Sequence, residues 1–309
     1  MDILLGIISQ GLTYSFLALG LYIAYSILDF PDLTVDGSFP LGAAVTVFAI
    51  LRGISPGLAL VISFLAGALA GSLTGLIHIK LKVEDLLAGL IMQTALWTIN
   101  LKIAGKANVP IFNSETIFST GLARLVPENL KSYDLLFVMI PLVFIIKILL
   151  DYFLRTKAGF ILKACGDNES LVRTMAVDPG RVKICGLALS NGLVALSGSI
   201  VCQDQRFFEV SMGTGSMVMG LASVVLGMKL LQSFDFIKDT TKVLIGSILY
   251  KASIALAIAL GFSANSMKLI TAVIFLVILI AGRGKRKKVH HAWTKINWQN
   301  FQYWNSKWE

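Results

Sequence analysis

Long apolar runs separated by short polar segments follow one another along almost the whole chain. They occupy residues 3–28, 38–51, 57–79, 86–104, 134–154, 184–202, 216–230, 243–262 and 267–282. Most of them are long enough to cross a bilayer as a helix, which takes about 20 residues. The pattern predicts an all-α protein, a polytopic transmembrane helical bundle of about eight or nine spans.

Two of these runs, 38–51 and 216–230, are short for a span. A helix over the first is about 21 Å long, against a hydrocarbon core of about 30 Å. Each run follows an acidic or glycine-rich break and comes early in one half of the chain. Such broken helices, whose N-terminal N–H groups can meet an anion, are typical of a translocation site at the bilayer midplane. The halves have opposite orientation, so we expect an inverted repeat, although their residues show no convincing similarity. Residues 38–51 either span the membrane or re-enter it.

Polar side chains near these breaks are candidates for lining a pathway. In the fourth run, Gln93, Trp97 and Asn100 form one stripe at helical spacing. Polar groups inside a membrane face either a partner helix or a wet cavity. Each candidate also fits a helix cap or an interhelical hydrogen bond. The pathway candidates are Asp36, Ser38, Gln93, Asn100, Thr214 and Ser216.

A ridge of small residues runs along the third span. Gly67, Gly71 and Gly75 follow one another at intervals of four, and Ser63 comes one step earlier. Small residues at this spacing allow two helix backbones to approach closely. The ridge therefore predicts close packing against another helix.

A charged segment, residues 155–183, interrupts the apolar runs in the middle of the chain. Asp167 is a good N-cap for a short helix over 168–176. The sequence Asp178-Pro179-Gly180 is expected to end that helix. At about 1.5 Å per residue, the helix is only about 14 Å long, so it lies along a membrane rather than across it.

This short helix has one charged and one apolar side. Glu169 and Arg173 are spaced for an ion pair between successive turns. The predicted apolar face contains Leu171, Val172, Met175 and Ala176. The pattern fits either a solvated connection between two spans or a surface that docks into a groove on a soluble partner.

Basic residues predict how the chain is oriented. The segment 155–183 and the tail 283–309 are both rich in Lys and Arg and are separated by four spans. Both are expected on the cytoplasmic side, which carries the excess of Lys and Arg in membrane proteins. The same count places the loop 105–133 and the N-terminus outside. The chain divides into a transmembrane domain, 1–282, and a basic cytoplasmic tail, 283–309.

The tail combines basic and aromatic residues. Four of the five tryptophans lie there: Trp293, Trp298, Trp304 and Trp308. Tethered directly to a span, such a segment favours membrane lipids with anionic headgroups. Disorder beyond about residue 295 is the alternative.

Composition narrows the class of function. Only 15% of the 309 residues are charged, and the mean hydropathy is +0.77. The net charge of +9 lies in loops and the tail, so it indicates orientation rather than nucleic-acid binding. The motifs G-x-x-x-x-G-K-S/T, H-E-x-x-H and G-x-S-x-G do not occur, and the three histidines and three cysteines lack metal-ligand spacing. We expect no enzyme activity and no bound cofactor in this chain.

Ionisable residues bear on the source of energy. The pattern indicates essentially no ionisable residues in the middles of the clear spans. Ion-coupled transporters and channels, in contrast, usually keep ionisable residues within the membrane. Energy for transport would then come from a partner.

Three stretches resemble a known family. The run 159–177, GFILKACGDNESLVRTMAV, resembles the cytoplasmic coupling segment of ABC importer permeases of the branched-chain amino acid and ribose permease superfamily. The run 32–37, DLTVDG, resembles the D-L-S/T-V-G element of the sugar branch, and 220–227 resembles a later small-apolar helix. Two details depart from the family pattern: Asp36 is an extra residue, and Ala176-Val177 stands where a glycine usually precedes the final hydrophobe. The tryptophan or tyrosine type is the closest subgroup.

The resemblance implies a permease subunit of the bacterial cytoplasmic membrane with several partners. These are a second permease copy, most simply as a homodimer, an ABC ATPase that binds ATP and Mg²⁺, and an extracytoplasmic substrate-binding lipoprotein. The implied cargo is an aromatic or branched-chain amino acid. The implied ATPase-coupling interface contains Gly159, Asp167, Asn168, Glu169, Leu171 and Met175.

Two other classes remain open at this stage. One is an ion-coupled secondary transporter or channel that works without an ATPase. The other is a receptor-like membrane scaffold that carries no cargo. Neighbouring genes for an ATPase and a lipoprotein would separate the importer from both.

Overall fold

The structure, a computed structural model, describes residues 2–120, 134–234, 236–261 and 267–281. The tail 283–309 and residues 121–133 of the long loop lie outside the described residues, so what the sequence predicts for them stays a prediction. The described chain is almost entirely helical, which confirms the all-α bundle. Its elements are α1 (Asp2–Leu21), the π-helix η1 (Tyr22–Ile27), α2 (Val35–Leu51), α3 (Pro56–Leu81), α4 (Asp85–Ala104), β1 (Asn108–Pro110), α5 (Asp134–Phe153), α6 (Lys157–Asp167), α7 (Glu169–Thr174), α8 (Pro179–Gln205), β2 (Phe207–Glu209), the 3₁₀-helix η4 (Val210–Gly213), α9 (Ser216–Leu230), α10 (Asp239–Ala259) and α11 (Met267–Ala281).

The long helices lie where the apolar runs predict them. Among the described residues, 7 helices are long and apolar enough to cross a membrane, and α2 is a shorter apolar helix. Large apolar side chains remain exposed on the outer faces, for example Leu65 and Leu69 of α3 and Phe144 of α5. Exposed apolar surface on this scale is typical of a membrane-facing protein.

Several helices begin earlier than predicted; α10, for example, begins at Asp239 rather than at residue 243. The span expected over 184–202 begins earlier, at Pro179, as the 27-residue helix α8. The Asp178 carboxylate accepts a hydrogen bond from the Gly180 N–H at 2.9 Å, and Pro179 occupies the first helical position. Both features start a helix. The residues expected to end the short helix therefore begin the next one.

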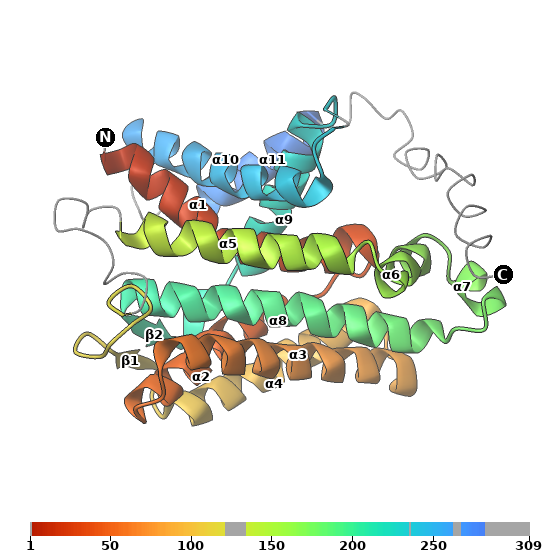
Figure 1. Cartoon of the computed structure of the whole chain (residues 1–309), viewed down its shortest axis with the longest axis horizontal. Helices are drawn as coiled ribbons and strands as arrows, with labels where there is room; N and C mark the ends of the chain where they lie inside the picture. Colours follow the sequence, from red (N-terminus) through yellow and green to blue (C-terminus); the bar gives the residue numbers. More distant parts are fainter. Residues whose placement is uncertain (1, 121–133, 235, 262–266, 282–309) are drawn as a thin grey trace.

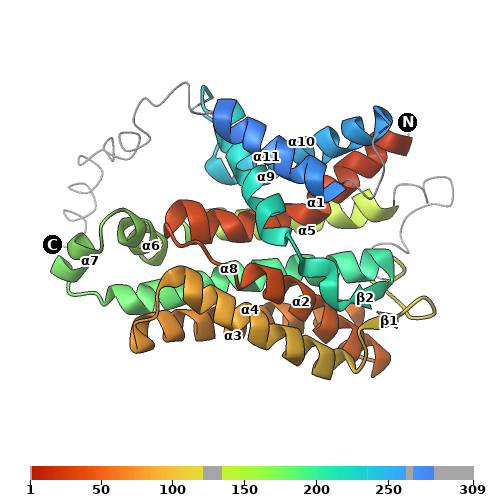
Figure 2. The same cartoon turned by 180° about the vertical axis from the view of Figure 1, so that it is seen from behind.

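The two halves of the bundle have the same order of elements in opposite directions. In Figures 1 and 2, α2 begins in the middle of the bundle and runs towards the strands, whereas α9 begins in the middle and runs towards the opposite end. α3 packs on α8 and α2, and α10 packs correspondingly on α1 and α9. α4 packs on α2, as α11 packs on α9. This arrangement is the expected inverted repeat.

The ridge of small residues seats α3 on α8. A Cβ atom on Gly71 would lie 2.1 Å from the Leu187 carbonyl oxygen, and one on Gly67 would lie 2.4 Å from the Asn191 carbonyl oxygen. Neither distance leaves room for a side chain. The ridge therefore serves helix packing, as predicted.

Two short strands were not predicted. β1 pairs antiparallel with β2, with Val109 opposite Phe208. The ladder ties the segment after α4 to the segment after α8, at the end of the bundle opposite α7 (Figure 1). Strands of 3 residues carry too little pattern to be recognised in the sequence.

Candidate functional site

The N-terminal ends of the two short helices meet in the middle of the bundle, where one carboxylate joins them. Asp36, in the first turn of α2, accepts hydrogen bonds from the Gly215 N–H at 3.1 Å, the Ser216 hydroxyl at 2.9 Å and the Met217 N–H at 2.8 Å. The first N–H groups of a helix have no partner within it, and a carboxylate suits their partial positive charge. We call Asp36, Gly215, Ser216 and Met217 the midplane clasp. The anion at the predicted half-helix N-terminus is thus a side chain of the protein itself.

Two glycines make the clasp possible. Gly215, directly before α9, has φ +86°, a conformation that other residues rarely adopt. A Cβ atom on Gly213 would lie 2.2 Å from the Asp36 carbonyl oxygen. The turn before α9 therefore approaches α2 as closely as a backbone can.

The two pathway candidates on α4, Gln93 and Asn100, lie beside the first turn of α2. The Asn100 amide donates a hydrogen bond to the Gly37 carbonyl oxygen at 3.1 Å. Its Oδ1 atom is buried without a hydrogen-bond partner among the described residues. Gln93 is half-buried, and a Cβ atom on Gly37 would lie 3.2 Å from its Cα. Both residues thus contact α2, and their role in a pathway stays a prediction.

The remaining two candidates face different surroundings. The Ser38 hydroxyl is fully buried and donates to Asn191 Oδ1 of α8 at 2.7 Å. Thr214 is exposed and ends η4. Ser38 therefore belongs to a buried network, and only Asp36 and Ser216 of the six candidates contact each other directly in the clasp.

That buried network includes an acidic residue outside the candidate set. Asp32 is fully buried and accepts hydrogen bonds from the Thr34 N–H at 2.9 Å and from Asn191 Nδ2 at 2.6 Å. The Thr34 hydroxyl is 2.8 Å from that of Thr74 in α3. These bonds fix the extended segment between η1 and α2 against α8 and α3. Asp32 is the first residue of the family-like run 32–37, and this place was the available signal in the sequence.

A lysine in the middle of α10 corrects the interpretation that the spans are free of charge. The Lys251 ammonium lies 3.6 Å from the centroid of the Tyr14 ring of α1. A charge at the centre of a membrane helix costs about 2.5–3.5 kcal/mol, and a cation–π contact returns about 0.5–2 kcal/mol. Lys251 stands near the centre of the run 243–262, so the sequence itself contains this charge.

At the α7 end, the charged segment contains a helix that was not predicted. α6 fills its first part, and the Thr156 side chain caps it by accepting from the Gly159 N–H at 3.3 Å. The prediction that Asp167 caps the short helix is wrong, because Asp167 is the last residue of α6. Asn168 takes that role: its Oδ1 accepts the N–H groups of Ser170 at 3.0 Å and Leu171 at 3.3 Å.

The short helix α7 also ends and pairs differently. It stops at Thr174, and Ala176 has φ +58°, outside the helical range. Glu169 forms an ion pair with Lys183 of α8 rather than the expected pair with Arg173. This ion pair ties the start of α7 to α8.

The apolar residues of α7 divide between two faces. Val172 is fully buried against the bundle, whereas Leu171 is 51% exposed and Met175, directly after the helix, is 43% exposed. The predicted single face is therefore wrong in part. Leu171 and Met175 remain as an exposed apolar pair at α7, and Glu169 and Val172 hold this helix to the bundle.

α6 also holds two titratable groups in partly apolar surroundings. Burial raises the pKa of the Cys165 thiol, whose Sγ lies 3.7 Å from the Pro179 carbonyl oxygen. Burial likewise lowers the pKa of the Lys163 ammonium. A buried thiol of raised pKa is a poor nucleophile, which agrees with a structural cysteine.

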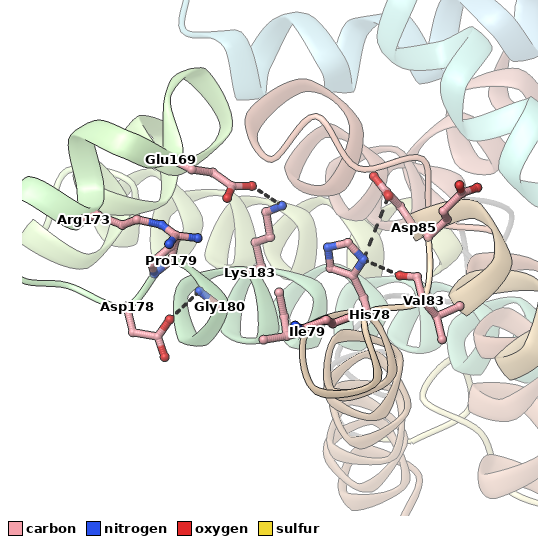
Figure 3. A pocket seen from close by; sticks show the side chains of 12 residues that line it. His78, Ile79, Val83, Asp85, Glu169, Arg173, Asp178, Pro179, Gly180 and Lys183 are labelled. Atoms are coloured by element: carbon pink, nitrogen blue, oxygen red, sulfur yellow. Dashed lines mark hydrogen bonds and ion pairs between the residues drawn. The ribbon is translucent and has the colours of Figure 1, made fainter.

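A groove of about 430 Å³ separates α7 from the turn between α3 and α4 (Figure 3). His78 faces it with Nδ1 2.8 Å from the Val83 carbonyl oxygen and 3.9 Å from Asp85 Oδ1. Across the groove is the ion pair of Glu169 with Lys183. Among the described residues, no cluster of three metal-binding side chains occurs, so His78 has no partners for a metal site there.

Comparison with known proteins now bears on this arrangement. Residues 3–281 match the family described as branched-chain amino acid transport system / permease component. The chain belongs to this permease family. It is therefore a multi-pass membrane permease component of an ABC-type transport system.

The permease is similar to several named proteins. It is 41% identical over 279 residues to the tyrosine transport system permease protein of Clostridioides difficile, a match that covers 90% of this chain and 91% of the relative. It is 28% identical over 224 residues to the probable branched-chain amino acid transport permease protein LivH of Methanocaldococcus jannaschii, covering 69% and 70%. It is 24% identical over 224 residues to the ribose import permease protein RbsC of Haemophilus influenzae, covering 72% and 64%. No solved structure matches the permease significantly.

In this permease, α7 and the midplane clasp are connected by closely packed backbone. A Cβ atom on Gly166 of α6 would lie 1.8 Å from the Ile27 carbonyl oxygen at the end of η1, and one on Gly159 would lie 2.3 Å from the Phe153 carbonyl oxygen. η1 leads directly through residues 28–34 to Asp36. α6 therefore packs directly against the end of η1, from which the chain leads to the clasp.

Proposed function

We propose that this permease is the membrane subunit of an ATP-driven importer for an amino acid, either tyrosine or a related aromatic or branched-chain amino acid. The observation that carries the proposal is the exposed apolar pair Leu171 and Met175 on α7. A capped helix that presents apolar side chains at one end of a membrane bundle suits docking into a groove on a soluble partner. The identity of 41% to a tyrosine transport permease supports the cargo class.

The proposed partners follow from the same surface and from the family. An ABC ATPase, which binds ATP and Mg²⁺, would dock on α7 at the cytoplasmic side of the bacterial cytoplasmic membrane. The basic residues of 155–183 and of the tail support this orientation, with the C-terminus inside. A second permease copy would complete the pathway, and an extracytoplasmic lipoprotein would deliver the amino acid at the opposite end.

The proposed mechanism uses the close contacts described above. ATP draws the two ATPases together and moves α7, which Glu169 and Val172 hold to the bundle. α6 transmits the displacement to η1 and the segment 28–34. The clasp then opens and lets α2 and α9 separate, which exposes the pathway alternately to each side. Much of the selectivity would reside in the binding protein.

The docking step is tested with Leu171→Asp in the permease expressed with its ATPase. A buried apolar anchor contributes about 2–4 kcal/mol to an interface, so the complex should weaken roughly 30- to 1,000-fold. Leu171→Met, which keeps the apolar contact, is the matched control. Co-purification of the ATPase with Leu171→Asp at the wild-type level would contradict the proposal.

An ion-coupled transporter is the second candidate, and Lys251 within the membrane is the observation that favours it. The two mechanisms differ in their need for nucleotide. Vesicles that contain the permease alone should not take up the amino acid if the importer proposal is correct. Full uptake without ATPase and ATP would establish the second candidate instead.

A further inference from the structure

Lys251 lies near the middle of α10, a helix long and apolar enough to cross a membrane. Its ammonium lies 3.6 Å from the centroid of the Tyr14 ring. Among the described residues, no carboxylate forms an ion pair with it, whereas Lys242 of the same helix pairs with Asp239 at 3.3 Å. Intramembrane cations usually pair or mark the path of a ligand.

The packing of α10 on α1 fixes this contact. The Ser247 hydroxyl donates to the Gly11 carbonyl oxygen at 2.9 Å, and a Cβ atom on Gly11 would lie 2.7 Å from the Ile248 Cα. Helical side chains lean towards the N-terminus of their own helix. Because α1 and α10 run in opposite directions (Figures 1 and 2), Tyr14 and Lys251 lean towards each other from either side of this crossing.

The same ring connects Lys251 with the midplane clasp. Tyr14 stacks on Phe39 of α2 with the ring centroids 6.0 Å apart and the planes at 8°. Phe39 follows Asp36 by three residues, close to one helical turn. Two ring contacts therefore link the cation to the turn of α2 that follows Asp36.

We propose that Lys251 binds the carboxylate of the transported amino acid as it passes the middle of the membrane. The Tyr14 ring holds the ammonium when the solute is absent. A carboxylate forms a stronger contact with an ammonium than a ring does in a medium of low dielectric constant, so the solute can displace the ring. The proposal rests on the proposed function and adds to it the residue that recognises the charged group of the cargo.

The first test is ATP-driven uptake of radiolabelled tyrosine by vesicles that contain the permease, its ATPase and its binding protein. Lys251→Met should lower uptake at least about tenfold, because it removes the charge at similar side-chain length. Lys251→Arg should retain most of the uptake. Lys229→Met, at an exposed position at the end of α9, is the control and should match the wild type. Assembly with the ATPase and basal ATP hydrolysis should be the same in all variants.

The second test measures binding directly, and one of its arms uses the wild type alone. Saturation-transfer NMR on the purified permease compares tyrosine with tyramine, which lacks the carboxylate. The wild type should show the larger signal for tyrosine, and Lys251→Met should show no such preference. Unchanged uptake in Lys251→Met, or equal signals for the two ligands in the wild type, would overturn this proposal and leave the proposed function standing. Absence of ATP-driven amino-acid uptake by the wild type would overturn the proposed function, and this proposal with it.

Discussion

Replacing Asp36 with alanine removes the carboxylate that joins the starts of the two short helices. The Gly215 and Met217 N–H groups then lose their acceptor, and the Ser216 hydroxyl loses its partner. These are the first N–H groups of α9, and no other turn of that helix can supply an acceptor for them. The expected result is faster opening of the first turn of α9.

The magnitude follows from the charge of the acceptor. A hydrogen bond to a charged group contributes about 1.5–3 kcal/mol net. Each 1.4 kcal/mol is a factor of about ten in an equilibrium. The N–H groups of Gly215 and Met217 should therefore exchange with solvent roughly 10- to 100-fold faster in Asp36→Ala. Asp36→Asn keeps an oxygen acceptor without the charge, so its exchange rates should lie between those of the wild type and those of Asp36→Ala.

Hydrogen–deuterium exchange on the purified permease, resolved to peptides that cover residues 213–219, measures this effect. Ser38→Ala is the matched control, because Ser38 lies two residues away in α2 and bonds to Asn191 rather than to α9. Its exchange over 213–219 should equal that of the wild type. Equal exchange in Asp36→Ala and the wild type would refute the role of the clasp.

Two glycine substitutions test two close backbone contacts, that of α3 with α8 and that of α6 with η1. Gly71→Val places a Cβ atom 2.1 Å from a carbonyl oxygen of α8 and should lower the free energy of unfolding by about 3 kcal/mol. Thermal unfolding in detergent measures this change. The control is Gly57→Ala, which should leave the stability unchanged because no atom lies within 4 Å of the added Cβ. Gly166→Val places a Cβ atom 1.8 Å from the Ile27 carbonyl oxygen and should leave ATP hydrolysis by the docked partner intact while amino-acid uptake falls at least about tenfold. Uptake and hydrolysis that remain coupled in Gly166→Val would contradict the proposed route through α6.

Apolar length and glycine turns made most of the bundle predictable. α9 begins and ends at the predicted residues, and Gly215, which takes a left-handed conformation directly before it, marks its start. The ridge of small residues, Gly67, Gly71 and Gly75, predicted a helix contact through its spacing alone. The partner of that contact, α8, could not be named, because any helix with an accessible backbone would satisfy the same pattern.

The errors at the α7 end have a local cause. Asp167 and Asn168 are both good N-caps, and the choice between them depends on α6, which extends through Asp167. Val172 and Leu171 are both apolar, and only the position of α7 on the bundle decides which of them is buried. Asp178 caps α8 instead of ending α7, because an Asp-Pro pair fits a helix start as well as a helix stop.

The clasp itself combines a prediction with a tertiary contact. The sequence indicated that Asp36 and Ser216 lie near two helix breaks, in corresponding places of the two halves. The contact of this carboxylate with the start of α9 joins Asp36 and Ser216, which are 180 positions apart in the sequence. No local pattern encodes that distance.

The central claim is that work done on α7 reaches the clasp, and exchange of the α9 amides in the assembled importer tests it most directly. Peptides covering 213–219 are compared with and without ATP and Mg²⁺, in the wild type and in Gly166→Val. The account predicts that nucleotide accelerates exchange at Gly215 and Met217 at least about tenfold in the wild type and much less in Gly166→Val. Exchange that ATP leaves unchanged in the wild type, in vesicles that import the amino acid, would contradict it.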